Sequence, residues 1–541
     1  MKGGMMQYPL SPTHFIERAG RWFGGRAVVS EGDEGTHRGS WAEVLDGARR
    51  VSALVASWHP TPGDRVATLG WNTHRHLELY FGVPAAGAVL HTVNVRLAPA
   101  QIARILEHAG TRTVLADPEF TDLVDRVERE VSRPLRKIVL DGGSPSSDAW
   151  PSYDELVDSV APVDPLPVWP EESAAGLCYT SGTTGEPKGV MYSHRAMALH
   201  AMAISLPDGF GLGENDTVLP AVPMFHANAW GLPHAAAMTG AGLVLPGPRP
   251  SVERIAHLLS REGVTFAAGV PTVWMGVLEE LRRSRLSLSP RLRIHSGGAP
   301  TPSSLVDAYR EEFGVEIVTG WGMTELTPVG MAAHPRHDMS AWTPAELAGI
   351  RTAQGTPLPF VEARAVDETG TEVDRDGRSV GELEVRGPWV AASYYQGGSP
   401  PESFRDGWLR TGDVATVDGR GYVRLVDRTK DLIRSGGEWI SSVQLENALM
   451  DDPRVSEAAV VAVPHPRWQE RPLACVVLKE GVGELDGSTL FAPLEGRFPR
   501  WWIPEDVVFM AALPRTSTGK FDKKTLREWV RRERGDGSDG S

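Results

Sequence analysis

Helical patterns and short β-branched strands alternate along the first part of the chain, and this alternation restricts the fold more than any other feature. Residues 41–58 repeat apolar side chains at helical spacing, and a strand pattern follows at 64–70. The same pair recurs as a helix pattern at 102–110 and a strand pattern at 113–117. We also expect one helix over residues 76–90. Such an alternation predicts an α/β fold, in which helices cover mostly parallel sheets.

The pattern changes after about Gly355. Three strand patterns separated by Gly and Asp turns follow, at 361–367, 381–387 and 421–427. This spacing favours antiparallel strands. Beyond Asp427 the pattern is that of a compact α+β unit, which ends in a Lys- and Arg-rich helix. We therefore place a domain junction near Asp427, between a domain of residues 1–427 and a domain of residues 428–541.

Charge and cysteine content argue against several classes of partner. The formal net charge is −14, from 69 acidic and 55 basic residues, whereas nucleic acids and anionic membranes select basic surfaces. The two cysteines, Cys178 and Cys475, exclude a disulfide framework and fit a reducing cytoplasm. The longest apolar stretches are shorter than the run of about 18 residues that spans a bilayer. We expect a cytoplasmic protein with no membrane span and no nucleic-acid partner.

The stretch "TSGTTGEPKGV", at residues 180–190, combines glycines, hydroxyls and one lysine after an apolar strand pattern. Glycines let backbone N–H groups approach phosphate oxygens, hydroxyls add donors, and lysine supplies positive charge. The stretch differs from the ordinary nucleotide-binding loop, because Pro187 precedes Lys188 and Gly189 follows it. Its alternative interpretation is a flexible turn between a strand and a helix. The composition favours a phosphate site.

Five motifs together resemble the adenylate-forming superfamily of acyl-CoA synthetases, adenylation domains and luciferases. They occur in the family's order: "YTSGTTGEPKGV" at 179–190, "GWGMTE" at 320–325, "WLRTGD" at 408–413, "DRTKDLIRSGGEWIS" at 427–441 and "PRTSTGK" at 514–520. The stretches "PMFHANAWGLPH" and "GGEWISSVQLENALM" look closest to bacterial medium- and long-chain fatty-acyl-CoA synthetases. The resemblance covers nearly the whole chain.

This resemblance implies a fold and a reaction. Residues 1–427 would form an AMP- and acyl-binding domain of stacked, mostly parallel sheets with a small distorted β-barrel. Residues 428–541 would form a small mobile lid domain. The reaction would join a bulky apolar carboxylic acid to ATP as an acyl-adenylate and then transfer the acyl group to coenzyme A, with Mg²⁺ as metal. The domains would alternate about a hinge at Asp427, and the family resemblance is compatible with a homodimer.

The resemblance also assigns roles to single residues. Glu325 and Thr184 would hold Mg²⁺, Asp413 would bind the ribose hydroxyls, Trp321 would flank the adenine where the family usually has Tyr, and Lys520 would reach the oxygen between carboxylate and phosphate. The predicted catalytic residues are Lys520, Glu325, Thr184 and His226. The predicted contacts to ATP or AMP are Thr180, Ser181, Gly182, Thr183, Thr184, Gly185, Lys188, Gly298, Ala299, Pro300, Gly320, Trp321, Gly322, Met323, Thr324, Asp413, Val426, Arg428, Lys430 and Lys520.

The acyl and CoA sites follow from the remaining motifs. Amino-acid-activating relatives carry an Asp after the Phe that corresponds to Phe225, and this chain has His226 there, so an amino-acid substrate would lack its counter-ion. Trp230 is either a gate in a fatty-acid tunnel or a core residue. The acyl-binding set is His226, Asn228, Ala229, Trp230, Gly298 and Gly320. The set for CoA and thioester formation is Arg434, where the family often has Lys, with Ser435, Gly436, Gly437, Glu438 and Trp439.

Each of these residues also has a purely structural interpretation. Asp413 could close a hairpin, and Glu325 could cap a helix. Three functions compete with the acyl-CoA synthetase: an acyl-adenylate ligase that feeds a carrier protein, an enzyme proficient in only one half-reaction, and a ligand-binding relative without activity. The presence of Lys520, Glu325 and Asp413 argues against the last of these.

Overall fold

The computed structural model describes residues 3–33, 35–58, 61–140, 150–180, 187–397, 403–435, 438–483, 485–515 and 521–534. The predicted contacts Ser181, Gly182, Thr183, Thr184, Gly185, Gly436, Gly437 and Lys520 lie outside these residues.

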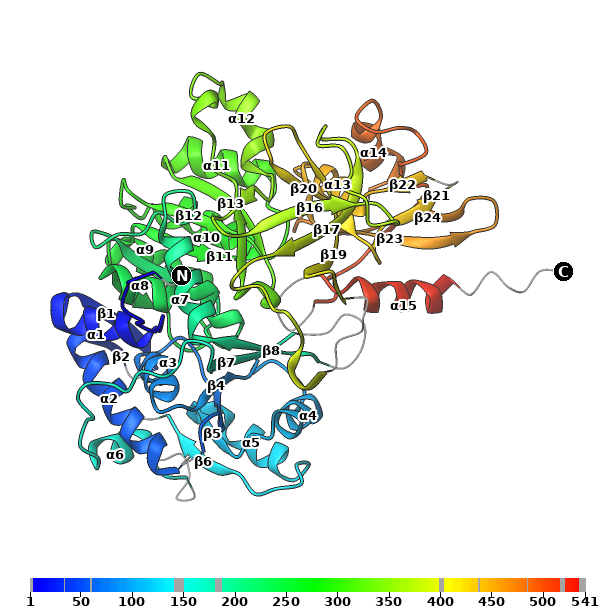
Figure 1. The fold of residues 1–541 in the computed structure, drawn as a ribbon. Helices are drawn as coiled ribbons and strands as arrows, with labels where there is room; N and C mark the ends of the chain where they lie inside the picture. Colours follow the sequence, from blue (N-terminus) through cyan, green and yellow to red (C-terminus); the bar gives the residue numbers. More distant parts are fainter. Residues whose placement is uncertain are drawn as a thin grey trace.

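A six-stranded sheet occupies the lower part of the molecule in the view of Figure 1. Its order is β6 (Arg136–Val139), β5 (Thr113–Ala116), β3 (Arg65–Leu69), β4 (Val89–Thr92), β7 (Ala174–Tyr179) and β8 (Gly189–Ser193). All neighbours are parallel except β7 and β8, which form an antiparallel pair. The accompanying helices are α2 (Trp41–Trp58), α3 (His74–Ala85), α4 (Pro99–Ala109), α5 (Thr121–Glu128) and α6 (Tyr153–Asp158).

The expected single helix over residues 76–90 is wrong. Helix α3 ends at Ala85, and Val89 begins strand β4. Gly87 has a φ of +79°, a left-handed conformation that turns the chain and that an L-residue adopts reluctantly. The apolar character of the segment continues through the turn because both elements are buried, so the hydrophobic pattern does not mark the boundary.

A nine-stranded sheet packs beside the first. Its order is β15 (Thr356–Pro357), β14 (Val329–Ala332), β13 (Glu316–Gly322), β12 (Arg293–Ser296), β11 (Phe266–Gly269), β9 (Thr217–Pro220), β10 (Gly242–Leu245), β1 (Ala27–Gly32) and β2 (Gly35–Ser40). The six strands from β13 to β1 along this order are all paired in parallel, whereas β2, β14 and β15 pair antiparallel. The helices of this part are α1 (Thr13–Trp22), α7 (His194–Ser205), α8 (Leu232–Thr239), α9 (Val252–Arg261), α10 (Pro271–Ser284), α11 (Ser303–Phe313) and α12 (Pro344–Arg351).

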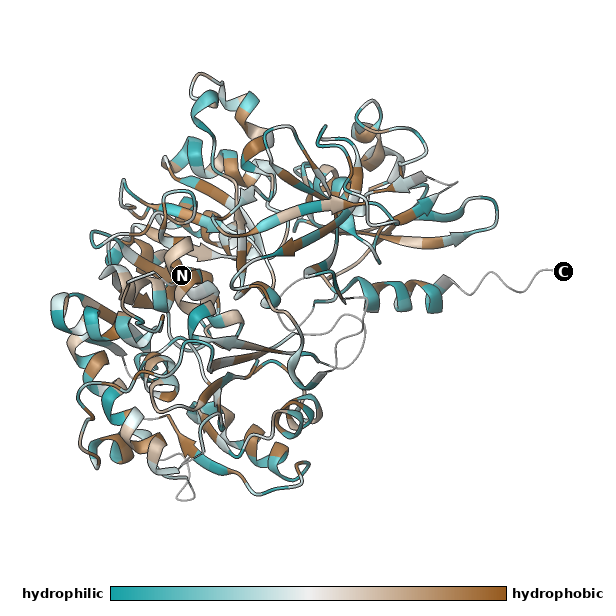
Figure 2. Ribbon diagram, in the orientation of Figure 1, coloured by the Kyte–Doolittle hydropathy of each residue, from teal (hydrophilic) through white to brown (hydrophobic). Residues whose placement is uncertain are grey.

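The largest buried cluster joins the two sheets. It contains Val66 and Leu90 of the six-stranded sheet, Val218 and Leu243 of the nine-stranded sheet, and side chains of α2, α3 and α8. Apolar residues accordingly colour the central strands of both sheets (Figure 2). The predicted α/β fold with mostly parallel sheets is confirmed.

An antiparallel half-barrel follows, as the change of pattern after Gly355 predicts. It contains β16 (Glu362–Val366), β17 (Val380–Arg386), β18 (Phe404–Arg405), β19 (Trp408–Val417) and β20 (Val423–Arg428).

The last sheet contains β21 (Ile433–Ser435), β22 (Glu438–Ile440), β23 (Val455–His465), β24 (Gln469–Leu478) and β25 (Val507–Phe509). Helices α13 (Ser442–Met450), α14 (Gly487–Phe491) and α15 (Lys523–Arg534) complete this smaller α+β part. Among the described residues, none of the helices combines the length and apolar character needed to cross a membrane.

Candidate active site

The glycine-rich segment connects two antiparallel strands. Strand β7 ends at Tyr179 and β8 begins at Gly189, and these two residues are paired in the sheet. The backbone N–H of Thr180 donates to the carbonyl of Lys188 at 2.9 Å, which closes the base of the segment. The alternative interpretation, a turn between a strand and a helix, is wrong, because the segment lies between two strands. Lys188 directly precedes the return strand, and its backbone is held by this hydrogen bond.

Three predicted nucleotide-site residues meet at the edge of the half-barrel. The indole N–H of Trp321 donates to Oδ2 of Asp413 at 2.8 Å. Nε of Arg428 lies 2.7 Å from Oδ1 of the same carboxylate. Asp413 is 2 % exposed, while the Arg428 side chain is 41 % exposed. The strand register pairs Asp413 with Arg428, so β19 and β20 hold the two charges opposite each other.

Glu325 forms a second polar group with a residue that the sequence analysis missed. The hydroxyl of Tyr394 donates to Oε1 of Glu325 at 2.6 Å. The ring of the same Tyr394 faces the ammonium of Lys188, with Nζ 4.8 Å from the ring centre. Tyr394 lies in the connection after β17 and belongs to none of the five motifs. Its only signal in the sequence is an aromatic pair, "YY", before a Gly-rich stretch.

The backbone around Glu325 is fixed from two sides. The hydroxyl of Tyr192 donates to the carbonyl of Thr324 at 2.7 Å, and the N–H of Ala391 donates to the carbonyl of Glu325 at 2.7 Å. Glu325 belongs to η3 (Thr324–Leu326) and is 5 % exposed. Burial raises the pKa of its carboxyl, and the hydrogen bond from Tyr394 acts in the opposite direction. A buried carboxylate held by a neutral donor has the hard oxygen ligands that Mg²⁺ prefers.

The acyl motif forms a left-handed turn. Residues Ala227, Asn228, Ala229 and Trp230 have φ values of 43°, 53°, 48° and 57°, and Gly231 follows at 77°. Left-handed helical geometry costs an L-residue roughly 1–2 kcal/mol, so this run is kept by its surroundings. His226 and Trp230 do not share the face of a right-handed helix, because η2 (Ala227–Gly231) does not have right-handed geometry. His226, which precedes the turn, is half-buried.

Trp230 lies against the strands that carry the predicted nucleotide contacts. A Cβ on Gly297 would lie 3.3 Å from Cη2 of Trp230 and 3.2 Å from the carbonyl oxygen of Gly320. The rings of Trp230 and His295 meet edge-on, with centroids 6.0 Å apart. Trp230 is 8 % exposed and is part of the main core. The acyl turn therefore contacts the end of β12, next to the Gly320 carbonyl of β13.

The other residues of the predicted nucleotide-binding and acyl-binding sets come from the same segments as Trp230, Gly297 and Gly320. Gly298 and Ala299 are half-buried and Pro300 is exposed, directly after Gly297. Asn228 is buried, and its Oδ1 accepts a hydrogen bond from the thiol of Cys178 at 3.5 Å. Ala229, Gly320, Gly322, Met323 and Thr324 are buried or half-buried.

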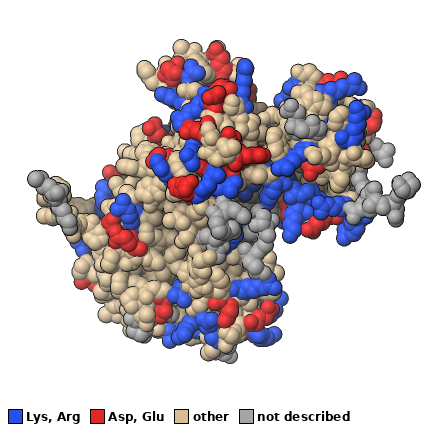
Figure 3. Space-filling model, turned by 45° about the vertical axis from the view of Figure 1, so that its right-hand side comes forward, with Lys and Arg blue, Asp and Glu red and all other residues tan. Residues whose placement is uncertain are grey.

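The predicted CoA residues lie on the C-terminal sheet. The guanidinium of Arg434 covers the ring of Trp439, 4.5 Å from its centre, and the two residues are paired between β21 and β22. Ser435 is buried, and its hydroxyl accepts a hydrogen bond from Arg471 at 3.3 Å. Lys and Arg side chains are dense on the part of the surface formed by the C-terminal elements (Figure 3).

The predicted hinge residue is part of a buried polar group. Oδ2 of Asp427 accepts a hydrogen bond from the N–H of Ser442 at 2.7 Å. Nζ of Lys523 lies 2.6 Å from the Ser442 hydroxyl and 2.6 Å from Oε1 of Glu446. The hydroxyl of Ser441 also donates to the carbonyl of Val426. Lys430, two residues after β20, is exposed. This group ties β20 to α13 and to the start of α15.

Two family models match the chain. The model described as AMP-binding enzyme matches residues 15–395, and the model of the AMP-binding enzyme C-terminal domain matches residues 444–520. The chain belongs to the AMP-binding enzyme family. The resemblance to adenylate-forming enzymes is thereby confirmed.

Named relatives of this AMP-binding enzyme are similar over their full length. A long-chain-fatty-acid–CoA ligase of Thermus thermophilus is 46% identical over 97% of this chain and 96% of its own. A 3-methylmercaptopropionyl-CoA ligase of Ruegeria pomeroyi is 42% identical over 98% of this chain and 99% of its own. The crystal structure of the anthranilate CoA ligase AuaEII with anthranoyl-AMP superimposes on this chain with a TM-score of 0.88 at 23% sequence identity. The superposition covers 99% of this chain and 100% of the AuaEII chain, which shows that the two share a fold.

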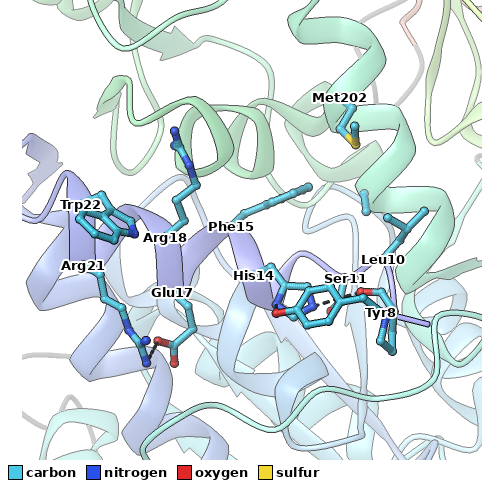
Figure 4. Close-up of a pocket in the computed structure, with 12 residues that line it drawn as sticks. Tyr8, Leu10, Ser11, His14, Phe15, Glu17, Arg18, Arg21, Trp22 and Met202 are labelled. Atoms are coloured by element: carbon cyan, nitrogen blue, oxygen red, sulfur yellow. Dashed lines mark hydrogen bonds and ion pairs between the residues drawn. The ribbon is translucent and has the colours of Figure 1, made fainter. Parts of the chain in front are cut away.

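A separate cavity of about 370 Å³ lies at the N-terminal segment of the AMP-binding enzyme (Figure 4). It is lined by residues before and within α1, among them Tyr8, His14 and Trp22, and by Met202 of α7. None of the predicted site residues lines it. It is therefore distinct from the site built around Glu325 and Asp413.

Proposed function

We propose that this AMP-binding enzyme is an ATP-dependent acyl-CoA ligase that activates a bulky apolar carboxylic acid, such as a medium- or long-chain fatty acid. The observation that carries the proposal is the position of Trp230, whose ring lies beside Gly297 and His295 at the end of β12, next to the Gly320 carbonyl of β13. A turn without acidic residues beside the predicted nucleotide contacts supports an apolar acid as the substrate that reacts with ATP.

The nucleotide side uses two polar groups. Asp413 accepts the ribose hydroxyls while Trp321 and Arg428 hold its carboxylate. Lys188 contributes charge toward the phosphates, together with the hydroxyls and N–H groups of Thr180 to Gly185. Glu325 and Thr184 hold Mg²⁺, which neutralises phosphate charge when bound. Residues Gly298 to Pro300, Gly320 to Thr324, Val426 and Lys430 complete the nucleotide contacts.

The first half-reaction is a displacement at the α-phosphate. A carboxylate oxygen of the acid forms a bond to the α-phosphorus, the bond to the bridging oxygen breaks, and pyrophosphate leaves with that electron pair. The side chain of Lys520 stabilises the charge that develops at the new bridging oxygen. His226, directly before the acyl turn, lines the channel near the carboxylate. Asn228, Ala229 and Trp230 form the wall beyond it.

The second half-reaction transfers the acyl group to CoA. The thiolate sulfur attacks the acyl carbonyl, the carbon–oxygen bond to phosphate breaks, and AMP leaves. The segment Arg434 to Trp439 serves this step after the domain 428–541 has rotated about Asp427 relative to the domain 1–427. Two contacts around Ser435 support this role. Ser435 of β21 is paired with Gln469 of β24, which follows the exposed Trp468. The guanidinium of Arg471 donates hydrogen bonds to the Ser435 hydroxyl and to the carbonyl of Trp501. Aromatic and cationic groups suit the adenine and phosphates of CoA.

The test is pyrophosphate release with a panel of acids, measured with and without CoA. The panel spans C4 to C18 fatty acids and includes 3-methylmercaptopropionate, because a 42%-identical relative is named for that acid. We expect release with apolar acids, strongly increased by CoA, and formation of the acyl-CoA. Release without thioester formation favours an acyl-adenylate ligase for a carrier protein or an enzyme of one half-reaction. An absence of release with every acid contradicts the proposal.

Two wider proposals belong to this function. The two cysteines, Cys178 and Cys475, are buried thiols, which supports a cytoplasmic location. A homodimer is the second proposal, and sedimentation equilibrium at several concentrations tests it directly.

A further inference from the structure

Lys188 and Glu325 carry opposite charges and approach the same tyrosine from two sides. The ammonium of Lys188 faces the ring of Tyr394 at 4.8 Å, and the carboxylate of Glu325 accepts the Tyr394 hydroxyl at 2.6 Å. Within the described part of the chain, Lys188 and Glu325 form no ion pair with each other, although the charge of Lys188 lowers the pKa of the Glu325 carboxyl. Tyr394 therefore contacts both charged groups.

Tyr394 is itself held firmly. Its ring packs edge-on against Phe404, with centroids 5.5 Å apart and an interplanar angle of 70°. It is 8 % exposed and belongs to a small cluster with Cys178, Val190 and Tyr192, which come from β7 and β8. The backbone of the same connection donates from Ala391 to Glu325. A ring fixed on so many sides can impose positions on the groups that it touches.

Direct pairing of Lys188 with Glu325 would remove both from other ligands. A close ammonium–carboxylate pair in a buried site is strongly attractive, so the two side chains would neutralise each other. A cation–π contact and a hydrogen bond from a neutral hydroxyl hold the same groups without cancelling their charges. The hydroxyl donates to Oε1 of Glu325.

We propose that Tyr394 is a positioning residue that keeps Lys188 and Glu325 apart and directs the first to phosphate and the second to the metal. The inference rests on the proposed function, since it takes Lys188 and Glu325 as the phosphate and metal contacts. It adds a residue outside the five motifs to the machinery of adenylate formation. Its two contacts make separate predictions, because the hydroxyl donates to Glu325 and the ring faces Lys188.

Two substitutions separate these contacts. Tyr394→Phe removes the hydroxyl and keeps the ring, and Tyr394→Leu removes both. Tyr395→Phe is the matched control. Tyr395 is the next residue and is half-buried, and its hydroxyl accepts a hydrogen bond from the side chain of Gln396. Each full-length variant is measured for Mn²⁺ binding, by electron paramagnetic resonance in the presence of a non-hydrolysable ATP analogue, and for KM and kcat of pyrophosphate release. Melting temperatures report the structural effect.

We expect Tyr394→Phe to weaken Mn²⁺ binding about tenfold and to lower kcat, with KM for ATP at saturating Mg²⁺ within about twofold of the unmodified protein. Tyr394→Leu should weaken both Mn²⁺ and nucleotide binding by at least tenfold. Tyr395→Phe should change neither. The inference is overturned if Tyr394→Phe binds Mn²⁺ normally, or if it weakens metal and nucleotide binding equally.

Glu325→Gln in the same Mn²⁺ measurement distinguishes the inference from the function on which it rests. If Glu325→Gln abolishes Mn²⁺ binding while Tyr394→Phe leaves it intact, only the role of Tyr394 is wrong. If Glu325→Gln also binds Mn²⁺ normally, the proposed metal site is wrong and the inference falls with it.

Discussion

The indole N–H of Trp321 donates a hydrogen bond to Oδ2 of Asp413, and the two atoms are 2.8 Å apart. Trp321 ends a strand of the nine-stranded sheet and Asp413 lies in the half-barrel, so this bond joins two sheets. The wider family usually has Tyr at the position of Trp321. We infer that Trp321 both flanks the predicted adenine position and orients Asp413, the residue predicted to bind the ribose.

Trp321→Phe tests that double role, because it keeps an aromatic wall and deletes the indole N–H. We expect KM for ATP to rise roughly three- to tenfold, since a hydrogen bond to a charged group contributes about 1 kcal/mol or more. The change in kcat should be smaller. Steady-state kinetics at saturating acid and CoA measure both. Trp342→Phe, a substitution of the same kind away from this site, serves as control, and equal effects of the two would contradict the assignment.

The ion pair between Lys523 and Glu446 should matter for stability. Nζ and Oε1 are 2.6 Å apart, and their side chains are 12% and 9% exposed. Lys523→Met leaves Glu446 and the nearby Asp427 without their cation, which should lower the free energy of unfolding by about 3 kcal/mol. Lys524→Met is the control, because Lys524 is the next residue and is exposed. Urea unfolding of the full chain measures the difference, and identical midpoints for the two variants would show that the pair is energetically neutral.

The hinge assignment makes a prediction about coupling between the half-reactions. Asp427→Pro fixes φ near −65° and should restrict rotation, so one half-reaction survives while the complete cycle collapses. Asp427→Pro also removes the carboxylate that accepts a hydrogen bond from the N–H of Ser442. The effect of losing this hydrogen bond must be separated from the effect of the fixed backbone angle. Asp427→Ala removes the carboxylate and leaves φ free, and it should retain the cycle. An unchanged overall rate in Asp427→Pro would place the hinge elsewhere.

Asp117 should make the protein less stable as the pH rises. It is 4% exposed, and burial raises the pKa of its carboxyl from 3.8 to about 7, although the N–H of Trp71 donates to it. An acid whose pKa is raised by folding contributes stability below its unfolded pKa and loses it as the pH rises toward the folded pKa. Asp117→Asn should therefore gain up to about 4 kcal/mol relative to the unmodified protein between pH 4 and pH 7. Melting curves across this range measure the effect, and a constant offset between the two proteins would contradict it.

Periodicity and motifs predicted the α/β part, the antiparallel part and the grouping of Trp321, Asp413 and Glu325 into one region. Local patterns do not encode which distant segments pair, so the contact between Tyr394 and Glu325, which are 69 residues apart, had no signal. The left-handed turn was also missed, because Ala227 to Trp230 contain no glycine and their geometry is imposed by packing. The strand β4 was absorbed into a helix pattern because both elements are equally apolar.

Trp230 can act as a gate of the acyl channel or as a core residue, and its surroundings provide a test for each. Trp230→Ala should relax the preference for chain length or bulk and leave ATP affinity nearly unchanged if the indole limits the channel. If the indole only fills the core, its removal should lower the free energy of unfolding by about 3–5 kcal/mol and impair all acids alike. Gly297→Ala supplies the opposite change, because its Cβ would lie 3.3 Å from Cη2 of Trp230 and press on the same ring without creating a cavity. We expect Gly297→Ala to narrow the range of accepted acids. A fatty-acid panel and melting temperatures on both variants decide the question, and a large loss of stability in Trp230→Ala with an unchanged ranking of acids would defeat the gate.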